Sequence, residues 1–161
     1  MDANTVEPFD EQFFAASGWW LTNSELRRLI LAPEPDEAAR RAWFETLPER
    51  HDYWIWGVCH NHKPIGCFGL KHIDLGHGKA EYWGYIGIPE FWGKGIGKWM
   101  LDQAITRAEL AGLHALHLQV LADNERAVRL YHRCGFVEVA RDNQLLTMQY
   151  RAKSTDDAAG R

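Results

Sequence analysis

Three glycines at alternate positions, Gly93, Gly95 and Gly97, are the residues whose spacing most directly suggests chemistry in this chain. They lie between a strand-like run, residues 80–88, and a helix-like run, residues 98–111. Where glycines open a helix, several N–H groups can turn toward one anion, and the helix dipole adds positive potential there. The spacing therefore predicts a phosphate-binding loop. A turn that only joins strand to helix is the alternative.

Two better-known glycine loops do not fit this segment. A dinucleotide-binding fingerprint needs G-x-G-x-x-G, whereas the spacing here is G-x-G-x-G. A Walker A loop needs a glycine at position 92 and a hydroxyl after its lysine, but the chain has Trp92, and Trp99 follows Lys98. Nucleotide hydrolysis is therefore not expected.

The loop and a second motif downstream together resemble the acetyl-CoA-binding core of the GNAT superfamily of N-acetyltransferases. That family's phosphate loop, Q/R-x-x-G-x-G/A, falls on residues 92–97, with Trp92 in place of the usual Gln or Arg. The resemblance covers about residues 4–150, and the order and separation of the two motifs make the pair specific. The downstream pattern, N-x-x-A-x-x-x-Y followed by G-F, falls on Asn124, Ala127, Tyr131, Gly135 and Phe136.

The resemblance implies acetyl-CoA as co-substrate. Its pyrophosphate would rest on N–H groups of the glycine loop, where Lys94 and Lys98 could add charge. Its pantetheine arm would pair with the end of the preceding strand and contact Asn124. The residues expected to bind the cofactor are Tyr85, Ile86, Gly87, Ile88, Trp92, Gly93, Lys94, Gly95, Ile96, Gly97, Lys98, Asn124, Ala127 and Tyr131.

The resemblance also implies direct transfer of acetyl to a primary amine in a ternary complex. An N–H expected from Gly87 would stabilise the oxyanion. Tyr131 would protonate the leaving thiolate, and Glu81, or else His72, would take the proton of the amine. A carboxylate among aromatic neighbours is expected to have a raised pKa. Each role has a plainer alternative: core packing for Tyr131, a helix N-cap for Asn124, and a structural or exposed carboxylate for Glu81.

Covalent and metal chemistry are not expected. Cys134 ends a helix, where the dipole raises the pKa of a thiol, so it is not expected to act as a nucleophile. Cys59 and Cys67 form no C-x-x-C pair with which to bind zinc. Three cysteines are an odd number without framework spacing, so we expect reduced thiols in a cytoplasmic protein.

Length and charge fit one domain that acts on a small molecule. A chain of 161 residues suits a single core over residues 1–152, with a loose tail at 153–161. A formal charge of −4 gives no footprint for nucleic acid, and no apolar run is long enough for a membrane helix. The expected partner is therefore a small-molecule amine, and a homodimer stays open.

Periodicity and turn residues predict an α/β fold with a mixed sheet flanked by helices. The resemblance implies that this sheet is split between its fourth and fifth strands. Gly84 and Gly87 favour a bulge in the fourth strand, although relief of aromatic crowding is the alternative. The strands are expected at 5–8, 53–59, 65–73, 80–88, 113–121, 136–140 and 144–150, and the helices at 10–20, 24–29, 35–47, 98–111 and 124–134.

The acceptor must be selected by the first helices and early strands. Residues 20–27, 43–44, 63–66 and 80–87 resemble the GNAT subgroup that acetylates nucleotide-linked 4-amino sugars of the pseudaminic-acid pathway. Arg27 could meet a diphosphate. Protein N-termini and polyamines are alternative acceptors, and a sensor that binds acyl-CoA without turnover is the alternative to an enzyme. The side chains that could stack a sugar or base are Trp19, Trp20, Trp54, Trp56 and Trp83, although each could instead fill the core.

Overall fold

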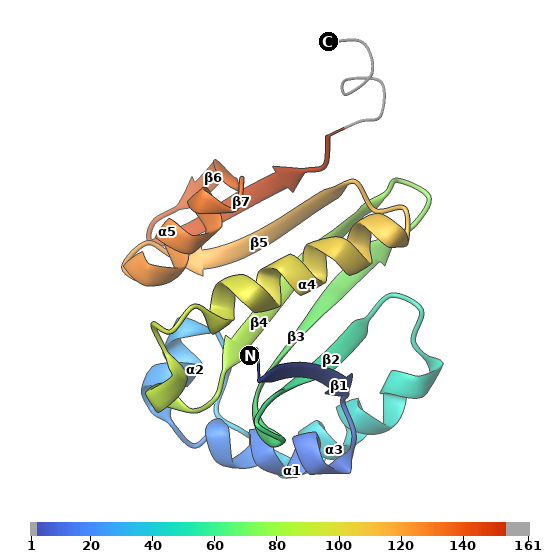
Figure 1. Cartoon of the computed structure of the whole chain (residues 1–161), viewed down its shortest axis with the longest axis vertical. Coiled ribbons are helices and arrows are strands. Elements are labelled where there is room, and N and C mark those ends of the chain that lie inside the picture. The colour runs from blue at the N-terminus through green and yellow to red at the C-terminus, as the bar shows by residue number, and fades with distance from the viewer. Residues whose placement is uncertain (1–2, 154–161) are drawn as a thin grey trace.

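The computed structural model describes residues 3–153, whose strands form one sheet in the order β1-β2-β3-β4-β5-β7-β6 (Figure 1). Neighbouring strands are antiparallel except β4 and β5, which are parallel. The predicted α/β fold with a mixed sheet is therefore confirmed. Apart from its first residue, the tail expected at 153–161 lies outside the described residues. The strands are β1 (Asn4–Pro8), β2 (Trp54–His60), β3 (Lys63–Asp74), β4 (Lys79–Ile86), β5 (Ala115–Leu121), β6 (Val137–Asp142) and β7 (Leu145–Arg151).

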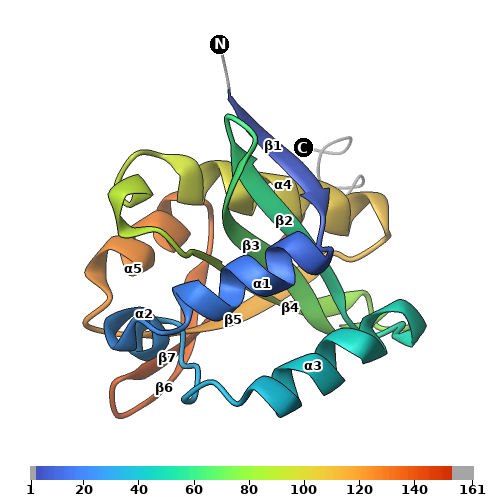
Figure 2. The ribbon, with the colours of Figure 1, turned by 90° about the horizontal axis from the view of Figure 1, so that it is seen from below.

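Helices cover both faces of the sheet (Figures 1 and 2). α4 and α5 pack on the face that carries Phe68 and Tyr82. α1 and α2 cover the other face, where Phe13 and Trp20 bury Cys67, and α3 lies beside them. None of the helices within residues 3–153 combines the length and apolar character needed to cross a bilayer. The helices are α1 (Glu11–Trp20), α2 (Ser24–Leu29), α3 (Glu37–Thr46), α4 (Ile96–Leu110) and α5 (Glu125–Arg133), with 3₁₀ turns at Leu47–Glu49 and Pro89–Phe91.

The helix starts follow from capping residues. Asp10 caps α1 as predicted, because its carboxylate accepts hydrogen bonds from the N–H groups of Gln12 and Phe13. Asn23 caps α2 in the same way. α4 begins at Ile96, two residues before the expected start at residue 98, and Gly95 takes the N-cap position.

The sheet splits where the sequence places the split. β4 and β5 pair at only three positions, the last of them Glu81 with His117. β4 nevertheless continues to Ile86 and β5 to Leu121. The expected division between the fourth and fifth strands is therefore confirmed, and it leaves backbone of β4 beyond Glu81 without a strand on that side.

The bulge expected inside β4 is wrong. β4 pairs with β3 in regular register from residue 81 to residue 86, and the irregularity lies in β3 between Lys71 and Asp74. The two glycines of this region, Gly84 and Gly87, instead leave space for neighbouring aromatic side chains. A Cβ at Gly84 would collide with the Tyr82 hydroxyl, and one at Gly87 would collide with the Trp20 indole. Relief of aromatic crowding is therefore the reason for glycine at both positions.

Candidate active site

A cavity of about 960 Å³ lies where β4 and β5 separate. Its walls come from α2, α3 and β4 on one side and from β5 and α5 on the other. Of the predicted catalytic residues, Glu81 and Tyr131 line it, whereas Gly87 does not. The predicted cofactor residues in its wall are Tyr85, Ile86, Trp92, Gly97, Asn124, Ala127 and Tyr131.

The glycine loop adjoins this cavity, because its two ends, Trp92 and Gly97, are part of the wall. Gly93 and Gly95 have φ of 71° and 85°, a conformation that favours glycine. Within residues 3–153, a Cβ built on Gly95 would meet no heavy atom within 4 Å apart from its own neighbours in the chain. The N-cap residue of α4 is Gly95, which has no side chain with which to bind the first N–H groups of the helix. The backbone therefore has the form that an anion site needs.

The charged residues at this loop differ from those predicted. Lys98 is bound to Asp102 at 2.8 Å along α4. Arg126, which was not predicted, places its guanidinium carbon 3.7 Å from the position of a Cβ on Gly93. The sequence signal that could have identified Arg126 is a basic residue two positions after Asn124, in the first turn of the next helix. A cation that was not predicted thus comes to the loop from α5.

Trp92 occupies the position where the family motif usually has Gln or Arg. Its indole Nε1 donates a 2.8 Å hydrogen bond to the carbonyl oxygen of Ile86, the last residue of β4. The side chain thereby links the glycine loop to the unpaired end of the strand. The sequence-based prediction for this position relied on the backbone and did not include this hydrogen bond from the side chain.

The prediction that Gly87 supplies the oxyanion N–H is wrong. That N–H donates a 2.7 Å hydrogen bond to the carbonyl oxygen of Ile65 in β3. Because residues of an antiparallel pair alternate between facing the partner strand and facing away, the N–H of Ile86 points away from β3. The Ile86 carbonyl already faces Trp92 on that side. Ile86 is therefore the residue whose N–H is directed to the split.

Tyr131 lines the cavity from α5 while packing in the core. Its ring lies 6.4 Å from that of Tyr82 and 5.8 Å from that of Phe136. Burial raises the pKa of Tyr131 to about 12, so its hydroxyl keeps its proton at neutral pH. Packing and proton donation are therefore compatible in one side chain. Burial also raises the pKa of the Cys134 thiol, which argues against a nucleophilic role there.

Glu81 lines the cavity with its side chain 15% exposed, but its electrostatics differ from the prediction. Burial alone would raise the pKa of this carboxyl. His117 and Lys71, each 3.3 Å away, outweigh burial and hold the pKa below its ordinary value. The expected raised pKa is therefore wrong, and Glu81 is ionised at neutral pH. His72, 3.9 Å from Glu81, is 70% exposed and lies outside the cavity wall.

Asn124 occupies the N-cap position of α5, but its side chain makes no capping hydrogen bond. The alternative of a side-chain N-cap is therefore wrong. Asn124 lines the cavity beside Ala127 and Tyr131, one and two turns farther along the same helix face.

Most of the side chains that were predicted to contact the acceptor, including Arg27, lie outside the cavity wall, and neighbouring residues line it instead. Of the five tryptophans that were predicted to stack on the acceptor, only Trp83 lines the cavity. Trp54 and Trp56 pack on the opposite face of the sheet, Trp19 is 78% exposed, and Trp20 is buried over Gly87. The aromatic side chains of the wall are Phe9, Trp43, Tyr53, Tyr82, Trp83, Tyr85, Trp92 and Tyr131.

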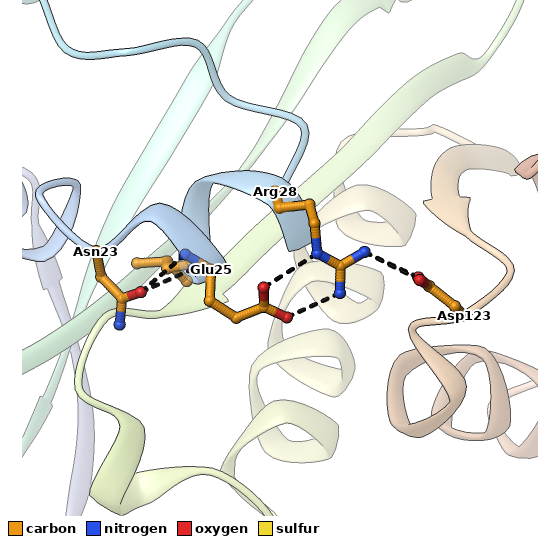
Figure 3. Close-up of polar contacts among 5 residues, drawn as sticks. Asn23, Glu25, Arg28 and Asp123 are labelled. Carbon is orange, nitrogen blue, oxygen red and sulfur yellow. Dashed lines mark hydrogen bonds and ion pairs between the residues drawn. The ribbon is translucent and has the colours of Figure 1, made fainter.

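Arg27 does not face the cavity. It donates a 2.8 Å hydrogen bond to the carbonyl oxygen of Leu21 and lies 3.7 Å from Glu34. The next residue, Arg28, lines the cavity instead. It binds Glu25 at 2.8 Å and Asp123 at 3.0 Å, which joins α2 to the turn before α5 (Figure 3). The helical phase of α2, set by its cap at Asn23, decides which arginine faces inward.

Within residues 3–153, no group of three or more His, Cys, Asp or Glu side chains is arranged to hold a metal ion. Glu81 meets two histidines, but Lys71 occupies the same carboxylate. The described site therefore consists of hydrogen-bonding backbone, a protonated phenol, an ionised carboxylate and aromatic walls.

Comparison with known proteins identifies relatives of this arrangement. Spermidine N(1)-acetyltransferase of Vibrio cholerae serotype O1 is 37% identical over 75 residues, which make up 46% of this chain and 43% of that protein. The chain thus spans less than half the length of this curated relative. The activity and the acceptor of the present chain therefore have to be inferred from the residues of its own site.

Solved structures share the fold over nearly the whole chain. Spermidine N-acetyltransferase from Vibrio cholerae, in complex with CoA and spermine, has a TM-score of 0.82 at 20% identity and covers 92% of this chain and 95% of its own. The N-acetyltransferase PseH of Campylobacter jejuni has a TM-score of 0.73 at 15% identity and covers 94% and 99%. Residues 17–136 match the Acetyltransferase (GNAT) family, and the chain therefore belongs to that family.

Proposed function

We propose that this chain is an N-acetyltransferase that moves acetyl from acetyl-CoA to a primary amine, and that the amine belongs to a nucleotide-linked amino sugar. The observation that carries the transferase assignment is the split after Glu81, which joins one cavity to the uncapped helix start at Gly95. An anion cradle beside a narrow opening suits a long ligand with phosphates at one end.

The residues present fit acetyl-CoA. The loop around Gly95 is open where phosphate oxygens would lie, Arg126 adds a cation, and the Asn124 side chain faces the cavity without a capping bond. Acetyl-CoA supplies the thioester that is cleaved. The N–H of Ile86, directed into the split, would donate to the carbonyl oxygen of the acetyl group as negative charge develops there.

Proton transfers are assigned to two side chains. The ionised Glu81 takes a proton from the amine, directly or through water, so that neutral nitrogen attacks the acetyl carbon. As the new C–N bond forms and the C–S bond breaks, the sulfur leaves with the bonding electrons. Tyr131, protonated at neutral pH, donates its proton to that sulfur. The nitrogen releases its second proton to solvent as the amide forms, and Tyr131 recovers a proton from solvent.

Charge in the cavity favours an acceptor that is not a polycation. The wall contains four carboxylates, and each one is near a basic side chain. Arg28 binds Glu25 and Asp123, and Lys71 binds Glu81. Glu125 lies 3.9 Å from Arg129. A polyamine gains most from unpaired carboxylates, and this wall offers it few.

The aromatic side chains of the wall also suit a sugar acceptor. The rings of Tyr53 and Tyr85 lie beside that of Trp83, and all three residues line the cavity. Such rings can pack against the apolar faces of a sugar.

Polyamines are the second candidate acceptor. The spermidine acetyltransferases of Vibrio cholerae support it in both comparisons, and PseH is one structural neighbour beside them. The two acceptors differ in charge, so the wall described above can separate them by experiment.

The test measures thiol release from acetyl-CoA in the presence of a UDP-linked 4-amino sugar, spermidine, or a peptide with a free N-terminus. We expect release with the amino sugar at a kcat/KM at least tenfold above that for the other two. Faster turnover of spermidine would reject the amino-sugar assignment. If acetyl-CoA raises the melting temperature but no amine releases CoA, the chain is a sensor and the transferase proposal fails.

A further inference from the structure

One arginine in the cavity wall holds two carboxylates, and Figure 3 shows these contacts. Arg28 donates through Nε and Nη2 to the two oxygens of Glu25, at 3.0 and 2.8 Å. Its Nη1 donates to both oxygens of Asp123, at 3.1 and 3.0 Å. Glu25 lies on α2 and Asp123 just before α5, so the guanidinium sits between two elements that are far apart in sequence.

The cluster has more negative than positive groups, because two carboxylates share one guanidinium. An alkylammonium carries three N–H donors and could take the same central place between Glu25 and Asp123. The position that would attract a cationic acceptor is therefore filled by the protein's own cation. All three residues line the cavity that Glu81 also lines, so they belong to the wall that an acceptor meets.

We propose that Arg28 is a specificity-determining residue that excludes polycationic acceptors by occupying the carboxylate pair of Glu25 and Asp123. This inference rests on the proposed function for its relevance to catalysis, since it concerns which amines enter the same cavity. It differs from a structural role in a measurable way. A residue that only fastens α2 to α5 would lower stability when removed, but it would not change how the cavity binds a cation.

The size of the effect follows from the exposure of the cluster. Arg28 is 44% exposed and Asp123 63% exposed, so solvent screens the interactions. With the guanidinium gone, we expect spermidine to bind roughly five- to tenfold more tightly at low salt, as for a few partly screened charge pairs. The gain should shrink toward nothing near 1 M salt, where the screening length is about 3 Å.

The experiment titrates spermidine into the CoA complex of the full chain, so that no turnover is needed. The variants are Arg28→Gln, which removes the charge, and Arg28→Lys, which keeps it. Arg141→Gln is the matched control, because Arg141 pairs with Glu138 on β6, away from the cavity. We expect tighter spermidine binding in Arg28→Gln alone, with Arg28→Lys and Arg141→Gln close to the unaltered chain.

Two results would overturn the inference: equal spermidine affinity in Arg28→Gln and the unaltered chain, or an equal gain in Arg141→Gln. If Arg28→Gln does not fold, Arg28→Met, which keeps the length of the side chain without its charge, tests the same idea. It should bind spermidine more tightly than Arg28→Lys does, and equal affinities in these two variants would again reject the inference. If no amine releases CoA while Arg28→Gln still binds spermidine more tightly, the proposed function fails and the carboxylate pair remains a cation site.

Discussion

Gly95 offers a direct test of the anion cradle, because the structure supplies a matched control for it. Gly95 and Gly112 lie just outside the two ends of α4, with φ of 85° and 88°. Within the part of the chain that the structure describes, a Cβ built on either residue would meet no heavy atom within 4 Å apart from its own chain neighbours. Replacing each by alanine therefore imposes the same backbone strain without a clash. Only the Gly95 substitution places its methyl group where phosphate is proposed to bind.

The two effects of the substitution have different magnitudes. A non-glycine residue in the left-handed region costs roughly 1–2 kcal/mol. In a chain of this size, each 1 kcal/mol lowers the melting temperature by roughly 2–4 °C. Both variants should therefore melt roughly 2–8 °C lower. A hydrogen bond to a charged group contributes about 1.5–3 kcal/mol, so losing one phosphate contact in Gly95→Ala should weaken acetyl-CoA binding roughly ten- to hundredfold.

Differential scanning fluorimetry measures the shared loss of stability, and titration calorimetry with acetyl-CoA measures the affinity. Gly112→Ala should keep the affinity of the unaltered chain. The reasoning is refuted if Gly95→Ala also keeps it, since the phosphates would then lie elsewhere. It is equally refuted if both variants lose affinity together, because the cause would be general destabilisation.

Three further substitutions probe the rest of the site. Tyr131→Phe should lower kcat roughly 10²-fold with acetyl-CoA affinity unchanged, which steady-state rates and calorimetry would measure. Since the pKa of Tyr131 is about 12, the unaltered chain should lose no activity through ionisation of this group below about pH 11. Glu81→Gln should lower kcat/KM roughly 10²- to 10⁴-fold. Because the pKa of Glu81 is depressed below 4.5, its contributions to activity and stability are present above that pH and are lost as pH falls below it. A pH profile with an acid limb near pH 6–7 that vanishes in Glu81→Gln would contradict this assignment. Gly87→Ala should reduce the unfolding free energy by roughly 1–3 kcal/mol in a denaturant titration, because its methyl would displace the Trp20 indole, and an unchanged midpoint would show that the ring moves freely.

Local signals in the sequence predict the helices and strands and the glycine turn before α4. Alternation and capping residues such as Asp10 fix the elements, and glycine spacing identifies the start of α4 because only glycine readily takes the backbone of positions 93 and 95. Asn124 and Tyr131 are likewise found by spacing, since one helix face carries both. These features depend on residues close together in the chain.

The errors concern interactions between distant segments. The pKa of Glu81 depends on Lys71 in β3 and His117 in β5, neither of which its aromatic neighbours in β4 reveal. The occupied N–H of Gly87 depends on the register with Ile65. Arg28 meets its second carboxylate, Asp123, only because α2 folds over the turn before α5. Such pairings follow from tertiary packing, and single-sequence periodicity does not contain them.

The split in the sheet also explains how one acceptor and one thioester can reach both proton-transfer residues. Glu81 is an odd-numbered residue of β4, on the face of Trp83 and Tyr85, whereas Tyr131 packs against Tyr82 on the opposite face. A fully paired sheet would separate these groups by its own thickness. Because pairing stops after Glu81, one cavity passes between the strands and contacts both. Under the proposed function, the amine gives up its proton on one face of the sheet while the sulfur receives one on the other. This arrangement suits direct attack, because the nitrogen and the sulfur are separate substituents of the tetrahedral intermediate and each needs its own proton-transfer group.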